Sequence, residues 1–132
     1  MQHFQEALVG KLQSDLDVAS LVGVEVRELD YQATNFVFPN VRVGRPEIQQ
    51  RDGTNCQYLV LFTITVNSSL PSSDECQRLF DAVMQALEEK QLVTTNVRTT
   101  DIVYRGCNAP YRSSVDSWRA DVFFSTRAVK PS

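Results

Sequence analysis

The sequence predicts an α+β fold: a mostly antiparallel β-sheet of about four strands with helices packed on one face, plus an extended polar hairpin or loop. Residues 58–66 have the aromatic and β-branched composition of a strand, and residues 118–127 alternate between apolar and mostly polar positions. Residues 73–90 instead repeat apolar side chains at helical spacing. Helical and strand patterns do not alternate regularly along the chain, which disfavours a parallel sheet with crossover helices.

Size and composition are those of a globular protein. The chain has 132 residues, so we expect one domain over residues 1–132. Hydrophobic residues make up 42% and charged residues 22%, an ordinary balance for a chain that buries a core. Apolar runs stay well short of the roughly 20 residues that a membrane span needs. We therefore expect no membrane association.

The strand expected at residues 58–66 is aromatic and β-branched throughout. One face is wholly apolar and consists of Val60, Phe62, Ile64 and Val66. The other face passes from apolar to polar and consists of Leu59, Leu61, Thr63 and Thr65. This pattern predicts a central strand that is buried on one face and half covered on the other, with Phe62 facing the helix that follows.

That helix is predicted to begin near Ser73 and to end near Lys90. Ser72 and Glu75 have the spacing of a capping box, in which each side chain accepts a hydrogen bond from the other residue's backbone N–H. The apolar stripe consists of Cys76, Leu79, Phe80, Val83, Met84 and Leu87. It predicts that one side of the helix packs on the sheet.

Before the central strand we expect a helix over residues 3–13 that Ser14 ends, a short second turn that Ser14 caps and Gly23 ends, and a strand over residues 24–29. Residues 30–40 have no clear pattern. Because Pro39 is unsuited to a central ladder position, an edge strand is expected to restart at residues 41–43. Residues 44–57 are polar and predict either a long hairpin, with its turn at Asp52 and Gly53, or a loop.

After the helix, residues 101–105 predict a further strand and residues 106–114 predict a loop. In the last strand, one face consists of Trp118, Ala120, Val122 and Phe124, and the other is mostly polar. Trp118 is therefore expected in the core, and residues 128–132 are expected to form a short tail.

The two ends of the chain differ in charge. Residues 1–30 hold six acidic and two basic side chains, whereas residues 98–130 hold six basic and three acidic ones. The formal net charge of −3 argues against a dedicated nucleic-acid binder. The asymmetry is either the ordinary variation of a solvated surface or a pair of complementary faces that meet between subunits.

Residues with the pattern of a catalytic or metal site are scarce. The cysteines lack the close paired spacing of zinc ligands: Cys56, Cys76 and Cys107. The only histidine is His3. Asp15 with Asp17, and Asp74 with Glu75, fall where helices are expected to start, so capping explains these carboxylates. We predict no catalytic site, no metal and no cofactor, and free thiols in a reducing compartment.

Two tyrosine–arginine pairs precede the last strand: Tyr104 with Arg105, and Tyr111 with Arg112. Such pairs can stack on nucleic acid, but tyrosine and arginine are also favoured at protein interfaces. The acidic net charge favours the second interpretation. Arg105, Tyr111 and Arg112 are therefore candidate interface residues.

The order of short patterns along the chain resembles a known family. A helix runs into residues 21–26 (LVGVEV), a Phe38–Pro39 step follows, and then come the polar hairpin, the strand at 58–66, the helix at 73–90 and a closing WRADVFF at residues 118–124. This order, over nearly the full chain, resembles the tail-terminator (tail-completion) proteins of long-tailed bacteriophages.

The resemblance implies a virion structural protein and not an enzyme. Such subunits form a ring, usually a hexamer, that caps the tail tube, stops its polymerisation and offers a docking surface to the head and neck. The implied partners are further copies of the chain, the tail tube protein and a head–neck connector or stopper protein. DNA would pass through the ring only as cargo. The implied location is the tail or neck of the virion, and the host cytoplasm during assembly.

In such a ring, the polar segment at residues 44–57 is expected to lie on a neighbouring subunit or on the tube, with Arg45, Arg51 and Asp52 as contact residues. Other functions stay open at this point. They are another head–tail joining ring protein (neck, stopper or connector), an enzyme or small-ligand domain without a sequence signature, and a nucleic-acid-binding module.

Overall fold

The computed structural model describes residues 2–23, 25–29, 38–52, 57–69, 73–95, 97–114 and 117–129. Within these ranges the chain forms three helices and seven strands. In chain order they are α1 (Gln2–Ser14), α2 (Leu16–Val22), β1 (Val26–Glu28), β2 (Asn40–Val43), β3 (Glu47–Asp52), β4 (Gln57–Ser68), α3 (Asp74–Leu87), β5 (Arg98–Thr99), β6 (Val103–Ser114) and β7 (Ser117–Val129). The predicted α+β class is confirmed, but the described strands form a sheet of seven strands, more than the four expected.

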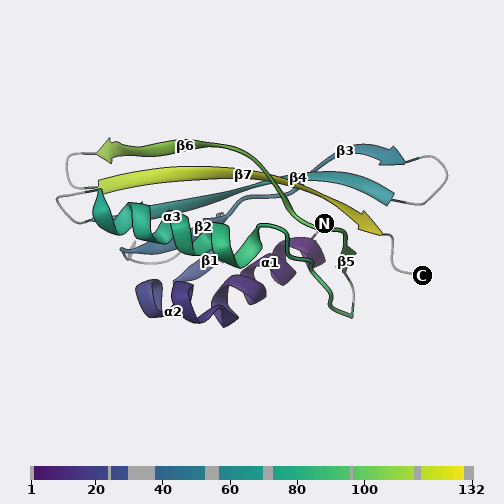
Figure 1. The fold of residues 1–132 in the computed structure, drawn as a ribbon, viewed down its shortest axis with the longest axis horizontal. Coiled ribbons are helices and arrows are strands. Elements are labelled where there is room, and N and C mark those ends of the chain that lie inside the picture. Colours follow the sequence, from purple (N-terminus) through teal and green to yellow (C-terminus); the bar gives the residue numbers. More distant parts are fainter. Residues whose placement is uncertain are drawn as a thin grey trace.

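The sheet is built around the antiparallel pair of β4 and β7 (Figure 1). Their register runs from Gln57 opposite Val129 to Ser68 opposite Trp118. The other edge of β4 pairs with β3 and then with β2, and the other edge of β7 pairs with β5 and β6. β1 extends the sheet beyond β2 and runs parallel to it, whereas the other pairs are antiparallel.

The three described helices lie on one face of the sheet, here called the inner face (Figure 1). The apolar face predicted for β4 is buried against them: Val60, Phe62, Ile64 and Val66. The Phe62 ring packs 5.5 Å from the ring of Phe4 on α1 and 5.4 Å from the ring of Phe124 on β7. The predicted inward face of the last strand is confirmed as well, although Trp118 is only partly buried at its end.

Helix starts follow the predicted capping chemistry only in part. Asp15 caps α2, since its Oδ1 accepts hydrogen bonds from the backbone N–H groups of Asp17 and Val18, both at 3.0 Å. In α3 the N-cap position is Ser73, whose side chain makes no capping hydrogen bond. Ser72 lies outside the described residues. The carboxylate of Glu75 instead accepts a hydrogen bond from the Ser68 hydroxyl at 2.7 Å, which ties α3 to the end of β4.

Two predictions about strands were wrong. Residues 41–43 belong to β2, which lies between β1 and β4 and is not an edge strand; Pro39 precedes it and so removes no hydrogen bond from it. Residues 106–114 are not a loop but most of β6. Register shifts in β6 accommodate its glycine and proline, as β-bulges do in edge strands.

The polar segment at residues 44–57 contributes one strand of a hairpin, which was one of the two predicted alternatives. β3 pairs with residues 57–61 of β4. Gly44 lies close to β4, donating its backbone N–H to the Thr63 carbonyl oxygen at 2.8 Å. Residues 53–56, which include the expected turn at Gly53, lie outside the described residues, as do residues 30–37.

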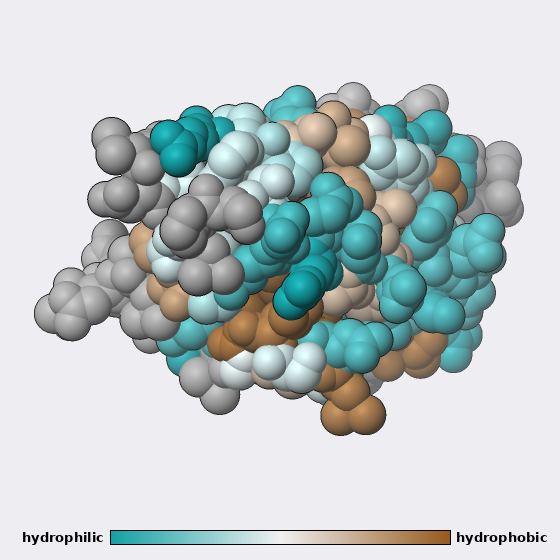
Figure 2. All heavy atoms as spheres, turned by 60° about the vertical axis from the view of Figure 1, so that its left-hand side comes forward, coloured by the Kyte–Doolittle hydropathy of each residue, from teal (hydrophilic) through white to brown (hydrophobic). Residues whose placement is uncertain are grey.

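Several large apolar side chains remain at the surface: Leu16, Leu29, Ile48, Val93, Val103, Tyr111 and Phe123. Figure 2 shows apolar atoms gathered on the lower part of one face among hydrophilic ones. None of the described helices is both long and apolar enough to cross a membrane. Single exposed apolar side chains are ordinary, whereas a contiguous apolar patch rimmed by polar groups is typical of a surface that contacts other proteins.

Candidate assembly surface

Polar side chains cross the outer face of the sheet, which is the face turned away from α1, α2 and α3. The strand register aligns them in two neighbouring rows. One row consists of Arg42, Thr65, Asp121 and Asn108, on β2, β4, β7 and β6. The next row consists of Asn40, Asn67, Arg119 and Tyr111 on the same strands. Five of these side chains are buried: Asn40, Arg42, Thr65, Asn67 and Asp121.

Asp121 lies at the centre of these rows and is only 5% exposed. Its Oδ1 accepts hydrogen bonds from Thr65 Oγ1 at 2.9 Å and from Arg119 Nε at 3.1 Å. Its Oδ2 accepts hydrogen bonds from Asn108 Nδ2 and Tyr111 OH, both at 3.2 Å. One carboxylate thereby joins β4, β6 and β7.

Burial alone would raise the pKa of Asp121, but hydrogen bonds from Thr65, Asn108 and Arg119 and the charge of Arg119 hold that pKa below its ordinary value. The carboxyl group is therefore ionised at neutral pH. Burial and the Asp121 carboxylate in turn raise the pKa of Tyr111, so its phenol stays protonated and can donate. The ionised Asp121 can thus accept all four hydrogen bonds, and the protonated Tyr111 can donate one of them.

The first row is also anchored at β2. Arg42 is buried, and its Nη1 donates to the backbone oxygens of Glu25 and Val41, both at 3.1 Å. Its Nη2 lies 3.4 Å from the Glu25 carboxylate. In the second row, Asn67 Nδ2 donates to Asn40 Oδ1 at 2.9 Å. Buried polar groups with satisfied hydrogen bonds hold a surface in one geometry.

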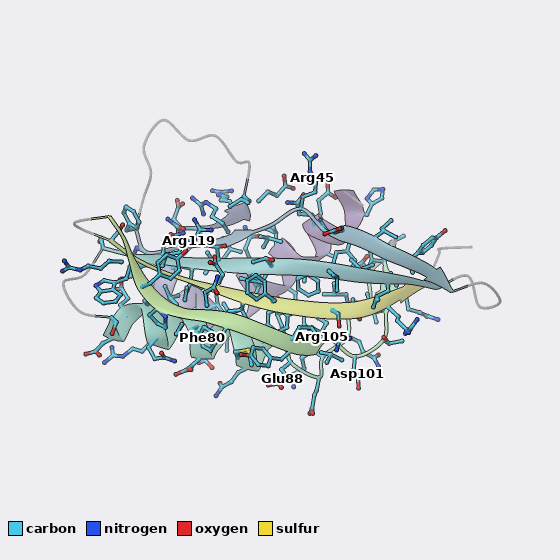
Figure 3. All side chains as sticks on the ribbon, turned by 90° about the horizontal axis from the view of Figure 1, so that it is seen from above. Arg45, Phe80, Glu88, Asp101, Arg105 and Arg119 are labelled. Atoms are coloured by element: carbon cyan, nitrogen blue, oxygen red, sulfur yellow. The ribbon has the colours of Figure 1, made fainter. Side chains whose placement is uncertain are left out.

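Beside these rows the outer face has a hollow of about 530 Å³. It is lined by Arg45, Glu47, Leu61, Phe62, Thr63, Arg105, Phe123 and Phe124. Leu61 is partly buried and Phe123 is 36% exposed, so both present apolar surface. Arg45 and Arg105 come from opposite sides of the β4–β7 pair (Figure 3). Arg105 is held by a hydrogen bond from its Nε to Ser125 Oγ at 2.8 Å.

The structure divides the six residues that the sequence singled out as interface candidates. Arg45 and Arg105 line the hollow, and Tyr111 belongs to the Asp121 network. Arg112 pairs with Trp118 instead, with its guanidinium carbon 5.8 Å from the centre of the indole ring. It therefore lies away from the hollow.

The remaining two candidates, Arg51 and Asp52, lie at the end of β3, where they pair with Tyr58 and Gln57. The central role of Asp121 was not predicted from the sequence. The only signal was a carboxylate within an otherwise apolar stretch of the last strand. Its partner Thr65 becomes evident only once the β4–β7 register is known.

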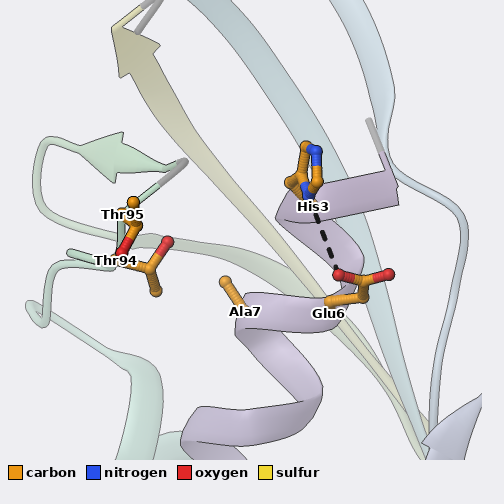
Figure 4. Close-up of a pocket in the computed structure, with 5 residues that line it drawn as sticks. All are labelled: His3, Glu6, Ala7, Thr94 and Thr95. Carbon is orange, nitrogen blue, oxygen red and sulfur yellow. Dashed lines mark ion pairs between the residues drawn. The ribbon is translucent and has the colours of Figure 1, made fainter.

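A second region of hollows borders α1. One, of about 260 Å³, is lined by His3, Glu6, Ala7, Thr94 and Thr95 (Figure 4). His3 Nδ1 lies 3.7 Å from Glu6 Oε2, and both side chains are mostly exposed. An exposed pair of this kind contributes little to stability. An adjacent hollow of about 390 Å³ continues along α1 to Ser14.

The thiols and carboxylates are spread over the fold. Within the described ranges, no group of three His, Cys, Asp or Glu side chains is placed to hold a metal ion. Cys76 is buried in α3, and burial, with the nearby carboxylates of Glu75 and Asp121, raises its pKa to about 11. Cys107 is exposed, and both thiols are free. Cys56 lies outside the described residues.

Comparison with known proteins gives the fold a family. The chain matches the family described as "Tail completion protein gp17" over residues 6–128. A search of curated proteins found no match. Among solved structures, a chain from the "Virion of native gene transfer agent (GTA) particle" matches with a TM-score of 0.82 and 23% sequence identity, covering 94% of this chain and 92% of that one. That likeness shows a shared fold. Because the family match spans nearly the whole sequence, the chain belongs to the tail completion protein gp17 family.

Proposed function

We propose that the protein is a virion structural subunit that forms a ring at the end of the phage tail tube. The ring stops tube polymerisation and presents a docking surface to the head and neck. The observation that carries this proposal is the family match over residues 6–128. On this proposal the chain is a single domain, it is not an enzyme, and its role depends on surfaces and not on reactive groups.

The distribution of charge supports a ring. A head-to-tail contact that closes into a ring needs two different and complementary patches on each subunit. The acidic N-terminal stretch forms α1, α2 and β1, whereas the basic C-terminal stretch forms β5, β6 and β7. In the sheet order, β1 stands at one end, and β7 and β5 stand at the other. The two stretches thus join the sheet towards opposite edges, although α1 also borders residues 91–94 near β5.

The outer face supports a role in docking. Its buried polar rows are held by cross-strand hydrogen bonds, so a partner meets a surface that is already ordered. A preorganised surface loses less conformational entropy on binding. The partners proposed are further copies of this chain, the tail tube protein and a head–neck connector or stopper. DNA passes through the ring as cargo.

The proposed location is the tail or neck of the virion, with the free subunit in the host cytoplasm during assembly. The structural match supports this location because its chain comes from a virion particle.

Removal of the gene from a particle-producing strain tests the function. The strain without this gene should produce tail tubes of irregular, excessive length that carry no heads. Negative-stain microscopy of the lysate measures the lengths. Complementation with the wild-type chain should restore normal length. Tubes of normal length without heads would instead favour the alternative, a neck, stopper or connector protein that joins a tail already terminated by another protein.

A further inference from the structure

Leu16 is 85% exposed, the largest exposed fraction among the large apolar side chains that the structure describes. It is the first residue of α2 and stands between Asp15 and Asp17. Asp15 caps the helix through two hydrogen bonds of 3.0 Å, so the backbone that presents Leu16 is fixed. Burial of this side chain against a partner would remove its apolar surface from water without first ordering a flexible segment.

We propose that Leu16 of one subunit inserts into the outer-face hollow of a neighbouring copy, and that this contact closes the ring. The inference rests on the proposed function and adds the contact that assembly would use. The hollow offers an apolar floor of Leu61 and Phe123. Contact with these two side chains would remove the apolar surface of Leu16 from water. This hydrophobic effect is the dominant favourable free-energy term in most protein association.

The charges around the two surfaces are complementary. Two guanidinium groups, from Arg45 and Arg105, and one carboxylate, from Glu47, border the hollow. Leu16 is flanked by Asp15 and Asp17, and Asp17 is exposed. With Leu16 in the hollow, Asp17 meets the arginine side of the rim. Such pairs set orientation and discriminate against wrong contacts more than they add affinity.

The positions of the two surfaces make the contact heterologous. α2 belongs to the helical layer on the inner face (Figure 1), whereas the hollow lies on the opposite face between Arg45 and Arg105 (Figure 3). A subunit therefore cannot satisfy its own hollow. Each copy uses Leu16 on one neighbour and offers its hollow to the other, which is the head-to-tail connectivity that closes into a ring when the rotation between copies is right.

Single substitutions test the contact in the purified full chain by native mass measurement and sedimentation. Leu16→Ser and Phe123→Ser should each weaken assembly by roughly 30-fold or more, as central interface residues do. The matched control is Leu29→Ser, because Leu29 is also an exposed leucine, at 54%, but lies beyond β1. It should assemble like the wild type, and circular dichroism should show all three variants folded.

Mixing the two defective variants gives a sharper test. A Leu16→Ser chain keeps a functional hollow, and a Phe123→Ser chain keeps a functional Leu16. Because the contact is heterologous, the mixture should form one-to-one dimers that grow no further. Rings from Leu16→Ser alone would overturn this inference and leave the proposed function standing. A wild-type chain that stays monomeric at all concentrations would also overturn this inference, whereas the proposed function is overturned by normal, headed tails after removal of the gene.

Discussion

The hydroxyl of Thr65 on β4 donates a hydrogen bond to the carboxylate of Asp121 on β7, with the two oxygens 2.9 Å apart. Both residues are buried on the outer face of the sheet. They are 56 positions apart in the sequence, so the bond exists only because the β4–β7 register places them opposite each other. It links the two central strands at the centre of the candidate assembly surface.

Replacement of Asp121 should therefore be costly. In Asp121→Ala, four donors lose their shared acceptor, and we expect a loss of about 1.5–3 kcal/mol in the free energy of unfolding, the range for hydrogen bonds to a charged group. Urea denaturation at pH 7 measures it. Asp81→Ala is the control, because the exposed Asp81 accepts a side-chain hydrogen bond from Gln77 on the same helix. It should change stability by no more than about 0.5 kcal/mol.

The same carboxylate predicts a dependence on pH. Burial opposes its ionisation, but the hydrogen bonds and the Arg119 charge outweigh burial, so its pKa in the folded state lies below the ordinary 3.8. A group with a lowered folded pKa contributes stability above its unfolded pKa and loses that contribution as pH falls through the folded pKa. The stability difference between wild type and Asp121→Asn should hold above about pH 5 and shrink below pH 3.8. A difference that stays constant to about pH 2 would contradict the assignment.

Phe62 should be a principal core residue. Its ring is packed between Phe4 and Phe124 and is 3% exposed. Phe62→Ala should cost about 3–5 kcal/mol, since it removes a buried ring and leaves a cavity. Thermal or urea unfolding measures the loss. Phe123→Ala, which truncates a partly exposed ring on the outer face, should cost less; a loss below about 1 kcal/mol for Phe62→Ala would contradict this packing.

Two glycines should respond oppositely to alanine. Gly23 ends α2 with φ of 62° and ψ of −123°, a region that side chains rarely adopt, so Gly23→Ala should destabilise by about 1–3 kcal/mol. Gly10 lies inside α1, and an added Cβ would meet nothing within 4 Å. Gly10→Ala should stabilise by about 0.5–1 kcal/mol through helix propensity. Melting temperatures that move in the same direction would refute the pair of predictions.

The thiols should differ in reactivity. With its pKa raised to about 11, Cys76 has about one thiolate in a thousand at about pH 8, and it is buried. In a Cys56→Ser background, iodoacetamide should label the exposed Cys107 first and Cys76 only after unfolding. Mass spectrometry after timed quenching measures both rates. Fast labelling of Cys76 in the folded chain would show that α3 is packed differently.

Much of the local structure followed from the sequence. The patterns at residues 58–66 and 118–124 identified both central strands and their buried faces. Successive side chains of a strand point to opposite faces, so a run of apolar residues at every second position shows which face is buried. Gly23 marked the end of α2 for the same local reason, since capping depends on neighbours in the chain, whereas the helix start is capped by Asp15 and not by Ser14. The resemblance drawn from the order of these elements agrees with the family match over residues 6–128.

The extent of the sheet and the assembly surface were decided by tertiary structure. Residues 106–114 have little strand character alone, yet they form β6 because β7 offers an edge and bulges absorb the irregular positions. The pairing of Thr65 with Asp121 and the hollow between Arg45 and Arg105 depend on cross-strand register. Register depends on how the apolar faces and turns of several strands fit together, so residues far apart in sequence decide it jointly.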